Sequence, residues 1–281
     1  MLGKTVVITG ATSGIGAITA RRLAGMGARI VFVARDRQRG EATLRELRAA
    51  NAGEAHTALY ADLSSLREMK RVAAEIAAAA PTIDVLMNNA GLIASGNEKT
   101  EDGLELMFAT NHLSHFVLTN LLLDRLRAAG AARIISTASE AHRRGRLDFA
   151  RLQPLKGASG YGTTKLCNIL FTRELARRIA ATGVTANCLH PGFVATRFGD
   201  NTGGALRAGL AVAKRLFALS PEDGAKTMVY LASSAEVAGR SGGYYDHCAP
   251  SEPSRAAQND ADAKRLWDLS AEITGIGAEV D

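Results

Sequence analysis

Short, nearly continuous runs of apolar and β-branched residues alternate along the chain with longer segments of helical periodicity. Runs of this kind are typical of strands covered on both faces, because no position of such a strand reaches solvent. The pattern predicts strands at Thr5–Thr9, Arg29–Ala34, Thr57–Ala61, Ile83–Met87, Arg133–Thr137 and Val184–Leu189. The segments between them are long enough for crossover helices, at about 15–26, 37–51, 65–79, 103–129 and 159–181.

This alternation predicts an α/β protein. Repeated βαβ units with right-handed crossovers build an open, doubly wound parallel sheet with helices on both faces. We expect a single domain over residues 1–281, because no tandem repeat and no linker rich in Pro, Gly or Ser divides the chain. Ser65, followed by Glu68 three positions later, predicts a capping box at the start of the third helix.

Composition excludes several classes of protein. A hydrophobic fraction of 47% and a charged fraction of 22% are typical of globular domains, which excludes intrinsic disorder. No segment reaches about 18 uninterrupted apolar residues, so we expect no membrane span. We also see no secretory signal pattern, which favours a cytoplasmic protein. Cys167, Cys188 and Cys248 form no CxxC pair, and we interpret them as reduced, mostly buried thiols.

The net charge of +6 would also suit a protein that binds nucleic acid. The arginines are scattered over helix-patterned segments, however, and no recognition motif accompanies them, so we expect no nucleic-acid partner. His112 and His115 lie three positions apart in a predicted helix. No third ligand lies nearby, so we interpret them as core or helix-face histidines and predict no metal site.

A glycine-rich loop follows the first predicted strand, at the edge where an open parallel sheet binds its ligands. It reads Gly10-Ala11-Thr12-Ser13-Gly14-Ile15-Gly16, with the spacing Gly-x3-Gly-x-Gly. Gly10 would permit the turn, Gly14 would remove a Cβ near phosphates, and Gly16 would let the next helix pack closely. Free N–H groups at that helix N-terminus favour a pyrophosphate, although three glycines can also form a plain tight turn. The predicted cofactor contacts here are Gly10, Thr12, Ser13, Gly14, Ile15 and Gly16.

The end of the second strand indicates which dinucleotide binds. An acidic residue there would hold the ribose diol of NAD, whereas an arginine accommodates the 2′-phosphate of NADP. The strand is followed by Arg35-Asp36-Arg37-Gln38-Arg39. Arg35 and Arg39 lie one helical turn apart and can both face a phosphate, so we predict NADP(H) rather than NAD(H). In the alternative, Asp36 binds the ribose or simply caps the second helix.

Further landmarks make the chain resemble the classical short-chain dehydrogenase/reductase family. They are the glycine loop, Asn88-Asn89-Ala90-Gly91, Asn111, Ser139, Tyr161-x3-Lys165 and Pro191-Gly192, in the family's order. Asn111–Phe116, Ser139–His142, Leu166–Leu175 and Arg265–Ser270 are similar to the retinol-dehydrogenase-like branch. The resemblance implies a single NAD(P)-binding Rossmann-type domain of about seven strands. It also implies a substrate lid at about 193–220 and a C-terminal segment at about 247–281.

Four residues carry the chemistry that the resemblance implies. Lys165 lies four residues after Tyr161 on a helix, so both project from one face. Its ammonium should favour the phenolate, as would the positive charge of an oxidised nicotinamide. Tyr161 could then take the proton of an alcohol, or give one to an alkoxide in reduction. Ser139, with Ser136 as a nearby alternative, could hydrogen-bond the substrate oxygen. In the family the lysine also holds the nicotinamide ribose, and Asn111 organises a water linked to that lysine.

The resemblance extends to the rest of the cofactor site. Asp62-Leu63 resembles the pair that contacts adenine, with an Asx turn as the alternative for Asp62. An apolar stripe in Gly203–Leu219 predicts a lid over a hydrophobic substrate, the alternatives being a fixed surface helix or a membrane-surface helix. The remaining predicted cofactor contacts are Asp62, Leu63, Asn89, Ala90, Gly91, Tyr161, Lys165, Pro191, Gly192, Val194 and Thr196.

These observations predict an NADP(H)-dependent oxidoreductase that interconverts a hydrophobic alcohol with its aldehyde or ketone, resembling a carbonyl reductase or retinol dehydrogenase. The partner is then a small hydrophobic substrate, and because family members often form dimers or tetramers, a homo-oligomer is an option. Two alternatives stay open: an NAD-preferring alcohol dehydrogenase of the same fold, and a non-enzymatic module that senses the nucleotide.

Overall fold

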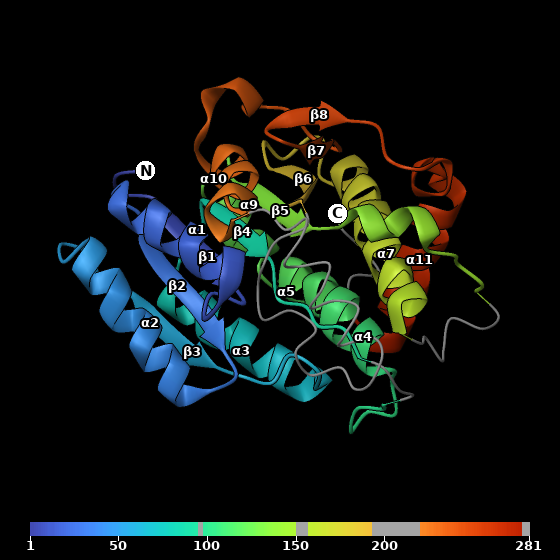
Figure 1. Cartoon of the computed structure of the whole chain (residues 1–281), viewed down its shortest axis with the longest axis horizontal. Coiled ribbons are helices and arrows are strands. Elements are labelled where there is room, and N and C mark those ends of the chain that lie inside the picture. The colour runs from blue at the N-terminus through green and yellow to red at the C-terminus, as the bar shows by residue number, and fades with distance from the viewer. Residues whose placement is uncertain (95–97, 150–156, 193–219, 277–281) are drawn as a thin grey trace.

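An eight-stranded sheet runs through the centre of the protein, which we describe from a computed structural model over residues 1–94, 98–149, 157–192 and 220–276 (Figure 1). The strand order is β3-β2-β1-β4-β5-β6-β7-β8. The strands are β1 (Thr5–Thr9), β2 (Arg29–Ala34), β3 (Thr57–Tyr60), β4 (Val85–Asn88), β5 (Arg133–Thr137), β6 (Thr185–His190), β7 (Tyr244–Asp246) and β8 (Ala249–Ser251). All neighbouring strands are parallel except β7 and β8.

The predicted doubly wound parallel sheet is confirmed, but the expected count of about seven strands is one short. The extra strand, β8, pairs antiparallel to β7 at the edge of the sheet. Pro250 lies at its centre, and proline, which lacks a donor N–H, is tolerated in a sheet at such an edge. Because proline is uncommon in strands, the sequence pattern does not predict this strand.

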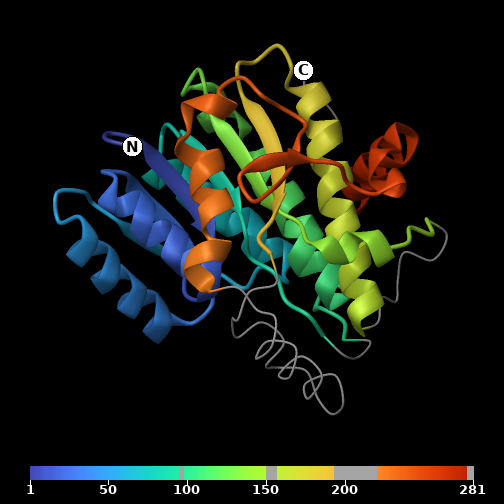
Figure 2. The ribbon, with the colours of Figure 1, turned by 45° about the horizontal axis from the view of Figure 1, so that its top comes forward.

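Helices cover both faces of the sheet (Figures 1 and 2). Val6 and Ile8 of β1 point into one core with α1 (Gly14–Gly25), α2 (Arg37–Ala50) and α10 (Lys226–Ser233), which the short α9 (Pro221–Gly224) precedes. Val7 points to the opposite face, because successive side chains of a strand alternate. That face is covered by α3 (Leu66–Ala79), α5 (Ser114–Leu121), α7 (Gly157–Arg178) and α11 (Asp260–Thr274).

Polar side chains define where several helices begin. Asp36 Oδ1 accepts the N–H of Arg39 at 2.7 Å at the start of α2. Ser65 Oγ accepts the N–H of Glu68 at 3.4 Å, which confirms Ser65 as the N-cap of α3, but the Ser65 N–H donates to the Asp62 carbonyl rather than to Glu68, so only half of the predicted capping box forms. Such caps satisfy N–H groups that have no partner inside the helix.

The segment predicted as one helix over 103–129 is divided, so that prediction is wrong. A π-helical turn, Ala109–Leu113, separates α4 (Leu106–Phe108) from α5, and the backbone of Leu122 separates α5 from α6 (Leu123–Arg127). Hydrophobic periodicity does not report an i→i+5 turn, because the residues around it are buried on every side. Turns of this kind are frequent at functional sites, and this one contains Asn111.

The C-terminal helix packs onto the middle of the molecule through aromatic rings. The Trp267 ring of α11 lies 4.9 Å from that of Phe116 and 5.9 Å from that of Phe171, between centroids.

Cys167 and Cys188 are buried, as predicted, whereas Cys248 is half-buried; all three are free thiols. Burial raises the pKa of Cys188 to about 12.

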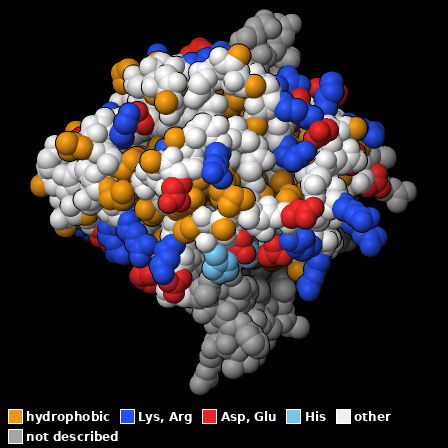
Figure 3. All heavy atoms as spheres, turned by 90° about the horizontal axis from the view of Figure 1, so that it is seen from above, with side chains coloured by type: hydrophobic (Ala, Val, Ile, Leu, Met, Phe, Trp, Pro, Cys, Tyr) orange, Lys and Arg blue, Asp and Glu red, His pale blue; other side chains and the backbone are white. Residues whose placement is uncertain are grey.

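The surface mixes charges of both signs. On the face in Figure 3, Lys and Arg side chains alternate with Asp and Glu around hydrophobic patches, and no single basic patch covers that face. Among the helices of the described residues, none has both the length and the apolar character needed to cross a bilayer.

Candidate active site

Most of the predicted site residues gather at one edge of the sheet. Gly10 follows β1, Asn89 follows β4, Ser139 comes two residues after β5, and Pro191 follows β6. These four strands are neighbours in the parallel sheet, so their carboxyl ends form one continuous edge, the place where open α/β sheets bind ligands. Tyr161 and Lys165 reach the same edge from α7, as the contacts below show.

The glycine loop owes its shape to close backbone approaches. Gly10 and Gly14 have φ of 70° and 56°, a region that favours glycine. A Cβ on Gly16 would lie 2.3 Å from the carbonyl oxygen of Gly10, closer than real Cβ contacts allow. The predicted roles of Gly10 in the turn and of Gly16 in close packing are therefore confirmed, and Gly14 has a conformational role as well. Ser13 leaves the start of α1 without a side-chain cap.

Asn89 ties the loop after β4 to the glycine loop. Its Nδ2 donates to the carbonyl oxygens of Thr9 at 2.9 Å and Gly10 at 3.2 Å. In return, Thr9 Oγ1 accepts the N–H groups of Asn89 and Ala90 at 3.0 and 2.9 Å. These bonds lock two loops from distant parts of the sequence. We did not assign a role to Thr9 from the sequence, although its place at the head of the glycine motif was a signal.

Of the alternatives for the residues after β2, the structure shows the helix cap by Asp36. Arg35 and Arg39 are exposed, whereas Asp36 caps α2, as one of the alternatives proposed. The Arg37 guanidinium, which we did not single out, lies 4.4 Å from the centre of the Tyr60 ring. Beyond β3, Asp62 Oδ1 accepts the N–H of Ser64 at 3.0 Å, so the Asx turn is present.

The structure brings Ser139 and Tyr161 together. Ser139 begins the 3₁₀ helix Glu140–Arg144, where its Oγ accepts the N–H of Ala141 at 3.2 Å, and its side chain hydrogen-bonds Tyr161. The alternative, Ser136, is 1% exposed inside β5. Two glycines that we did not single out permit the approach: a Cβ on Gly162 would lie 2.5 Å from the Ala141 oxygen, and one on Gly145 would lie 2.5 Å from the Gly162 oxygen.

Lys165 and Asn111 both lie beside Gly91. Lys165 Nζ lies 5.5 Å from the Tyr161 ring centre and donates to the Thr137 carbonyl at 2.8 Å. Asn111 Oδ1 accepts the Leu92 N–H at 2.8 Å, and its Nδ2 donates to the Leu92 carbonyl at 2.8 Å. A Cβ on Gly91 would lie 3.3 Å from Asn111 Oδ1 and 3.5 Å from Lys165 Nζ. Hence Gly91, Asn111 and Lys165 converge on one point.

Burial, rather than a neighbouring charge, dominates the ionisation of this pair. Burial raises the pKa of Tyr161, and the hydrogen bond from Ser139 lowers it by less. Burial likewise lowers the pKa of Lys165 to about 7. We expected Lys165 to lower the pKa of the Tyr161 phenol, but that pKa is raised. Burial removes water from both side chains and so disfavours the charged form of each. The Tyr161 phenol is therefore neutral near pH 7.

His112 and His115 are core histidines, as predicted. His112 Nε2 hydrogen-bonds Ser270 Oγ at 2.9 Å, and burial lowers its pKa to about 4. His115 Nε2 lies 3.2 Å from the Ala90 oxygen, and burial followed by the charge of Lys165 lowers its pKa. The described residues contain no cluster of three His, Cys, Asp or Glu that could hold a metal ion.

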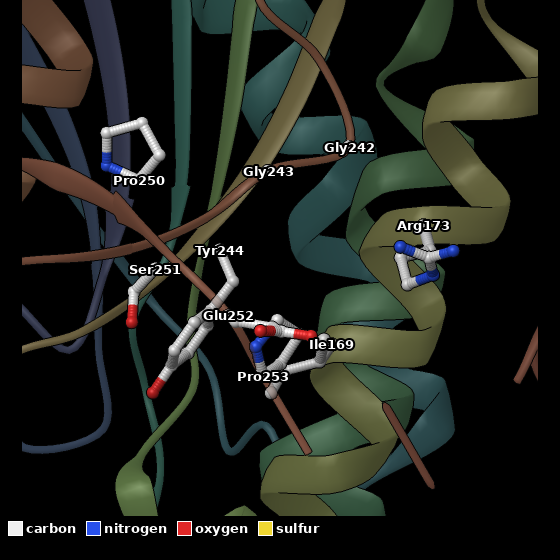
Figure 4. Close-up of a pocket in the computed structure, with 9 residues that line it drawn as sticks. All are labelled: Ile169, Arg173, Gly242, Gly243, Tyr244, Pro250, Ser251, Glu252 and Pro253. Carbon is white, nitrogen blue, oxygen red and sulfur yellow. The ribbon is translucent and has the colours of Figure 1, made fainter. Parts of the chain in front are cut away.

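Part of the predicted substrate side lies outside the described residues: Val194, Thr196 and the proposed lid with its apolar stripe. Pro191 and Gly192, which are described, follow β6 at the expected edge. A surface hollow of about 330 Å³ lies elsewhere, between α7 and the β7–β8 hairpin (Figure 4). Arg173, Tyr244 and Glu252 are among its lining residues, which include none of the predicted catalytic or cofactor-binding side chains.

Comparison with known proteins agrees with this geometry. Residues 4–207 match the family described as short chain dehydrogenase. Retinol dehydrogenase 14 of Mus musculus is 41% identical over 98% of this chain and 87% of its own length. Retinol dehydrogenase 13 of Homo sapiens is 39% identical over 98% and 86%. Among solved structures, the RhlG/NADP active-site complex of Pseudomonas aeruginosa has a TM-score of 0.71 at 26% identity, covering 87% of this chain and 94% of that one.

Proposed function

The chain belongs to the short-chain dehydrogenase family, and on that premise we propose that it is an NADP(H)-dependent oxidoreductase interconverting a hydrophobic alcohol with its aldehyde or ketone. The observation that carries this proposal is the convergence of Ser139, Tyr161, Lys165 and Asn111 at the carboxyl edge of the sheet. Their contacts join three separate elements of the fold, and they place a proton donor beside a second hydroxyl.

The glycine loop fits a dinucleotide. A Cβ on Gly10 would lie 2.8 Å from Asn89 Nδ2, and one on Gly16 would strike the Gly10 carbonyl, so only glycine at both positions lets the loop keep this shape at the N-terminus of α1, where a pyrophosphate would bind. Gly10, Ser13 and Gly14 would hold the phosphates, while Gly91 and Lys165 would border the nicotinamide ribose. The bound nicotinamide supplies hydride transfer.

In the reductive direction, the protein's own residues manage one proton. Burial keeps Tyr161 protonated, so its hydroxyl donates a proton to the alkoxide oxygen as charge develops there. The Ser139 hydroxyl donates a hydrogen bond to the same oxygen, which stabilises that charge. Ser139 Oγ accepts the Ala141 N–H and directs its own proton to Tyr161, so the substrate oxygen would replace the phenol oxygen as the acceptor of that proton.

The residues after β2 support NADP(H) over NAD(H). Arg35 and Arg39 are exposed just after β2, whereas the Asp36 carboxylate caps α2. The Beutenbergia cavernae protein described as an NAD(P) dependent gluconate 5-dehydrogenase with bound NADP at low occupancy has a TM-score of 0.71 at 30% identity, covering 88% of this chain and 96% of that one, and supports a dinucleotide cofactor of either kind. The names of the retinol dehydrogenase relatives support a hydrophobic substrate and make retinal the first probe.

The test is turnover by a Tyr161→Phe variant. NADPH oxidation is followed by absorbance with retinal, aliphatic aldehydes and steroid ketones, and NADPH binding by fluorescence. We expect turnover to fall by about 10²- to 10⁴-fold while NADPH binding is retained. Tyr230→Phe is the matched control, because Tyr230 lies on α10 and its hydroxyl donates to Glu236, away from the site. Normal turnover by Tyr161→Phe would overturn the mechanism, and NADPH binding without turnover by the wild type would favour the nucleotide-sensing alternative.

A further inference from the structure

His142 lies beneath the backbone of Ser139 and is fully buried. Its Nδ1 lies 2.7 Å from the Ser139 carbonyl oxygen, and its Nε2 accepts the N–H of Ser254 at 3.0 Å. A backbone N–H can only donate, so Nε2 is unprotonated and the ring hydrogen is on Nδ1, which donates it to Ser139. One imidazole thus connects the serine beside Tyr161 with Ser254, which lies 112 positions after His142.

We propose that His142 is a positioning residue, which fixes Ser139 relative to Tyr161 and makes that position depend on the C-terminal segment Glu252–Ser254. The proposal rests on the proposed function, because it concerns the same hydroxyl pair.

Other contacts fasten the same turn from both sides. The N–H of Glu140 donates to His190 Nδ1 at 3.2 Å, so the residue after Ser139 is anchored to the end of β6. The Arg143 guanidinium donates to the carbonyl of Glu252 at 3.0 Å. The His142 ring meets the ring of Tyr244 edge-on, with centroids 5.3 Å apart. The turn is therefore held by β6, by β7 and by the C-terminal segment.

The backbone of Ser139 needs this support because of where it lies. Its residue begins a short 3₁₀ helix at the end of β5, and its carbonyl accepts both the backbone N–H and the ring N–H of His142. Displacing a reacting group by about 1 Å can cost about a hundredfold in rate. Loss of the ring bond should therefore appear in kcat rather than in cofactor binding.

Two isosteric substitutions separate the two ring nitrogens. The amide of His142→Asn can place an N–H near Nδ1, whereas that of His142→Gln reaches the position of Nε2. With retinal and NADPH we expect kcat to fall about ten- to a hundredfold in His142→Gln, to stay within about threefold of wild type in His142→Asn, and the KM for NADPH to be unchanged in both. Equal kcat values for the two variants would overturn the proposal.

A second pair tests the link to the C-terminal segment. Ser254 has φ of −60°, which proline can adopt. Ser254→Pro and Ser254→Ala both lose the hydroxyl that caps Ala257, but only the proline loses the N–H that His142 accepts. We expect kcat to fall by about threefold or less in Ser254→Pro relative to Ser254→Ala, because His142→Asn, which loses the same bond to Ser254, keeps kcat within about threefold of wild type. Equal kcat values would show that the C-terminal segment does not act through His142.

A readout without substrate separates this proposal from the proposed function. Hydrogen exchange of the peptide that spans residues 138–145 should be faster in His142→Gln than in His142→Asn, and faster in Ser254→Pro than in Ser254→Ala. If the wild type turned over no carbonyl compound, the proposed function would fail while this exchange difference still decided whether His142 holds the turn. Equal exchange rates within each pair would reject it.

Discussion

The two sides of the site are built by different forces. We call the glycine loop with Asn89–Gly91 the nucleotide side, and Asn111, Ser139, Tyr161 and Lys165 the catalytic side. Close backbone approaches shape the nucleotide side, where a single Cβ would collide with a carbonyl. Buried polar and titratable groups shape the catalytic side, where loss of hydration shifts the pKa of both Tyr161 and Lys165. An added methyl group should therefore disrupt the first, and a change of pH the second.

The largest effect is expected from the charge of Lys165. Burial lowers its pKa from 10.5 to about 7, so between these values the unfolded chain binds a proton that the folded chain does not. Stability should rise with pH across this window. Relative to Lys165→Met, the wild type should gain about 4 to 5 kcal/mol of unfolding free energy from pH 7 to 10.5.

Urea unfolding of both proteins across the window measures this difference. Lys264→Met, which removes an exposed lysine on α11, should change stability by no more than about 0.5 kcal/mol. A difference between wild type and Lys165→Met that does not vary with pH would show that Lys165 keeps its charge when folded.

The next largest effect concerns His112 and acid. Its pKa is lowered from 6.5 to about 4 by burial, so the unfolded chain takes up the proton first as the pH falls. The wild type should lose about 3 kcal/mol relative to His112→Gln between pH 6.5 and 4. Denaturant unfolding at intervals through this range measures it, and His115 is present in both proteins and cancels. His247→Gln, at an exposed position, is the control; a parallel pH dependence of wild type and His112→Gln would contradict the prediction.

On the nucleotide side, one added methyl group should be enough to weaken NADPH binding. Gly16→Ala places a Cβ against the Gly10 carbonyl, and overpacking of this kind costs about 1 to 3 kcal/mol, or about a ten- to hundredfold weaker Kd for NADPH. Gly25→Ala adds the same methyl to α1 in open space and should leave the Kd unchanged. Fluorescence titration with NADPH compares the two. Equal Kd values for the two variants would contradict the claim that close backbone approaches shape the nucleotide side.

The smallest effect should come from Arg35. Removing one charge-assisted hydrogen bond to a 2′-phosphate in Arg35→Ala should raise the KM for NADPH about tenfold, which is about 1.4 kcal/mol, and the KM for NADH much less. Arg37→Ala is the matched control, since that guanidinium lies over Tyr60. Steady-state kinetics with both cofactors decide it, and equal effects on NADPH and NADH would exclude a 2′-phosphate contact.

The nucleotide side could be predicted from the sequence to a greater depth than the catalytic side. Spacing alone identified Gly10 and Gly16, because their roles depend on the few residues around them, and the N-cap of α3 at Ser65 was equally local. The π-helical turn around Asn111 and the strand that contains Pro250 were missed, because periodicity and propensity do not report them. The direction of the Tyr161 pKa was also missed, since burial is a property of the whole fold.

His142 shows that contacts between residues far apart in the sequence are also hard to predict. The pairing of Ser139 with Tyr161 follows from the order of motifs, but nothing near His142 in sequence indicates that it accepts the N–H of Ser254. Contacts over such separations depend on how the final segment returns to the sheet, which no local pattern encodes.

The packing of α11 has a consequence for the order in which the protein is made. The hydrogen bonds that fix the glycine loop join Thr9, Gly10 and Asn89. All three residues have left the ribosome once residue 91 has emerged from it. By contrast, His112 can bond Ser270, and Phe116 and Phe171 can pack against Trp267, only after α11 has been synthesised. During synthesis, then, the part of the fold that holds a nucleotide can form early, while the part that carries the proposed chemistry is completed only by the last helix of the described chain.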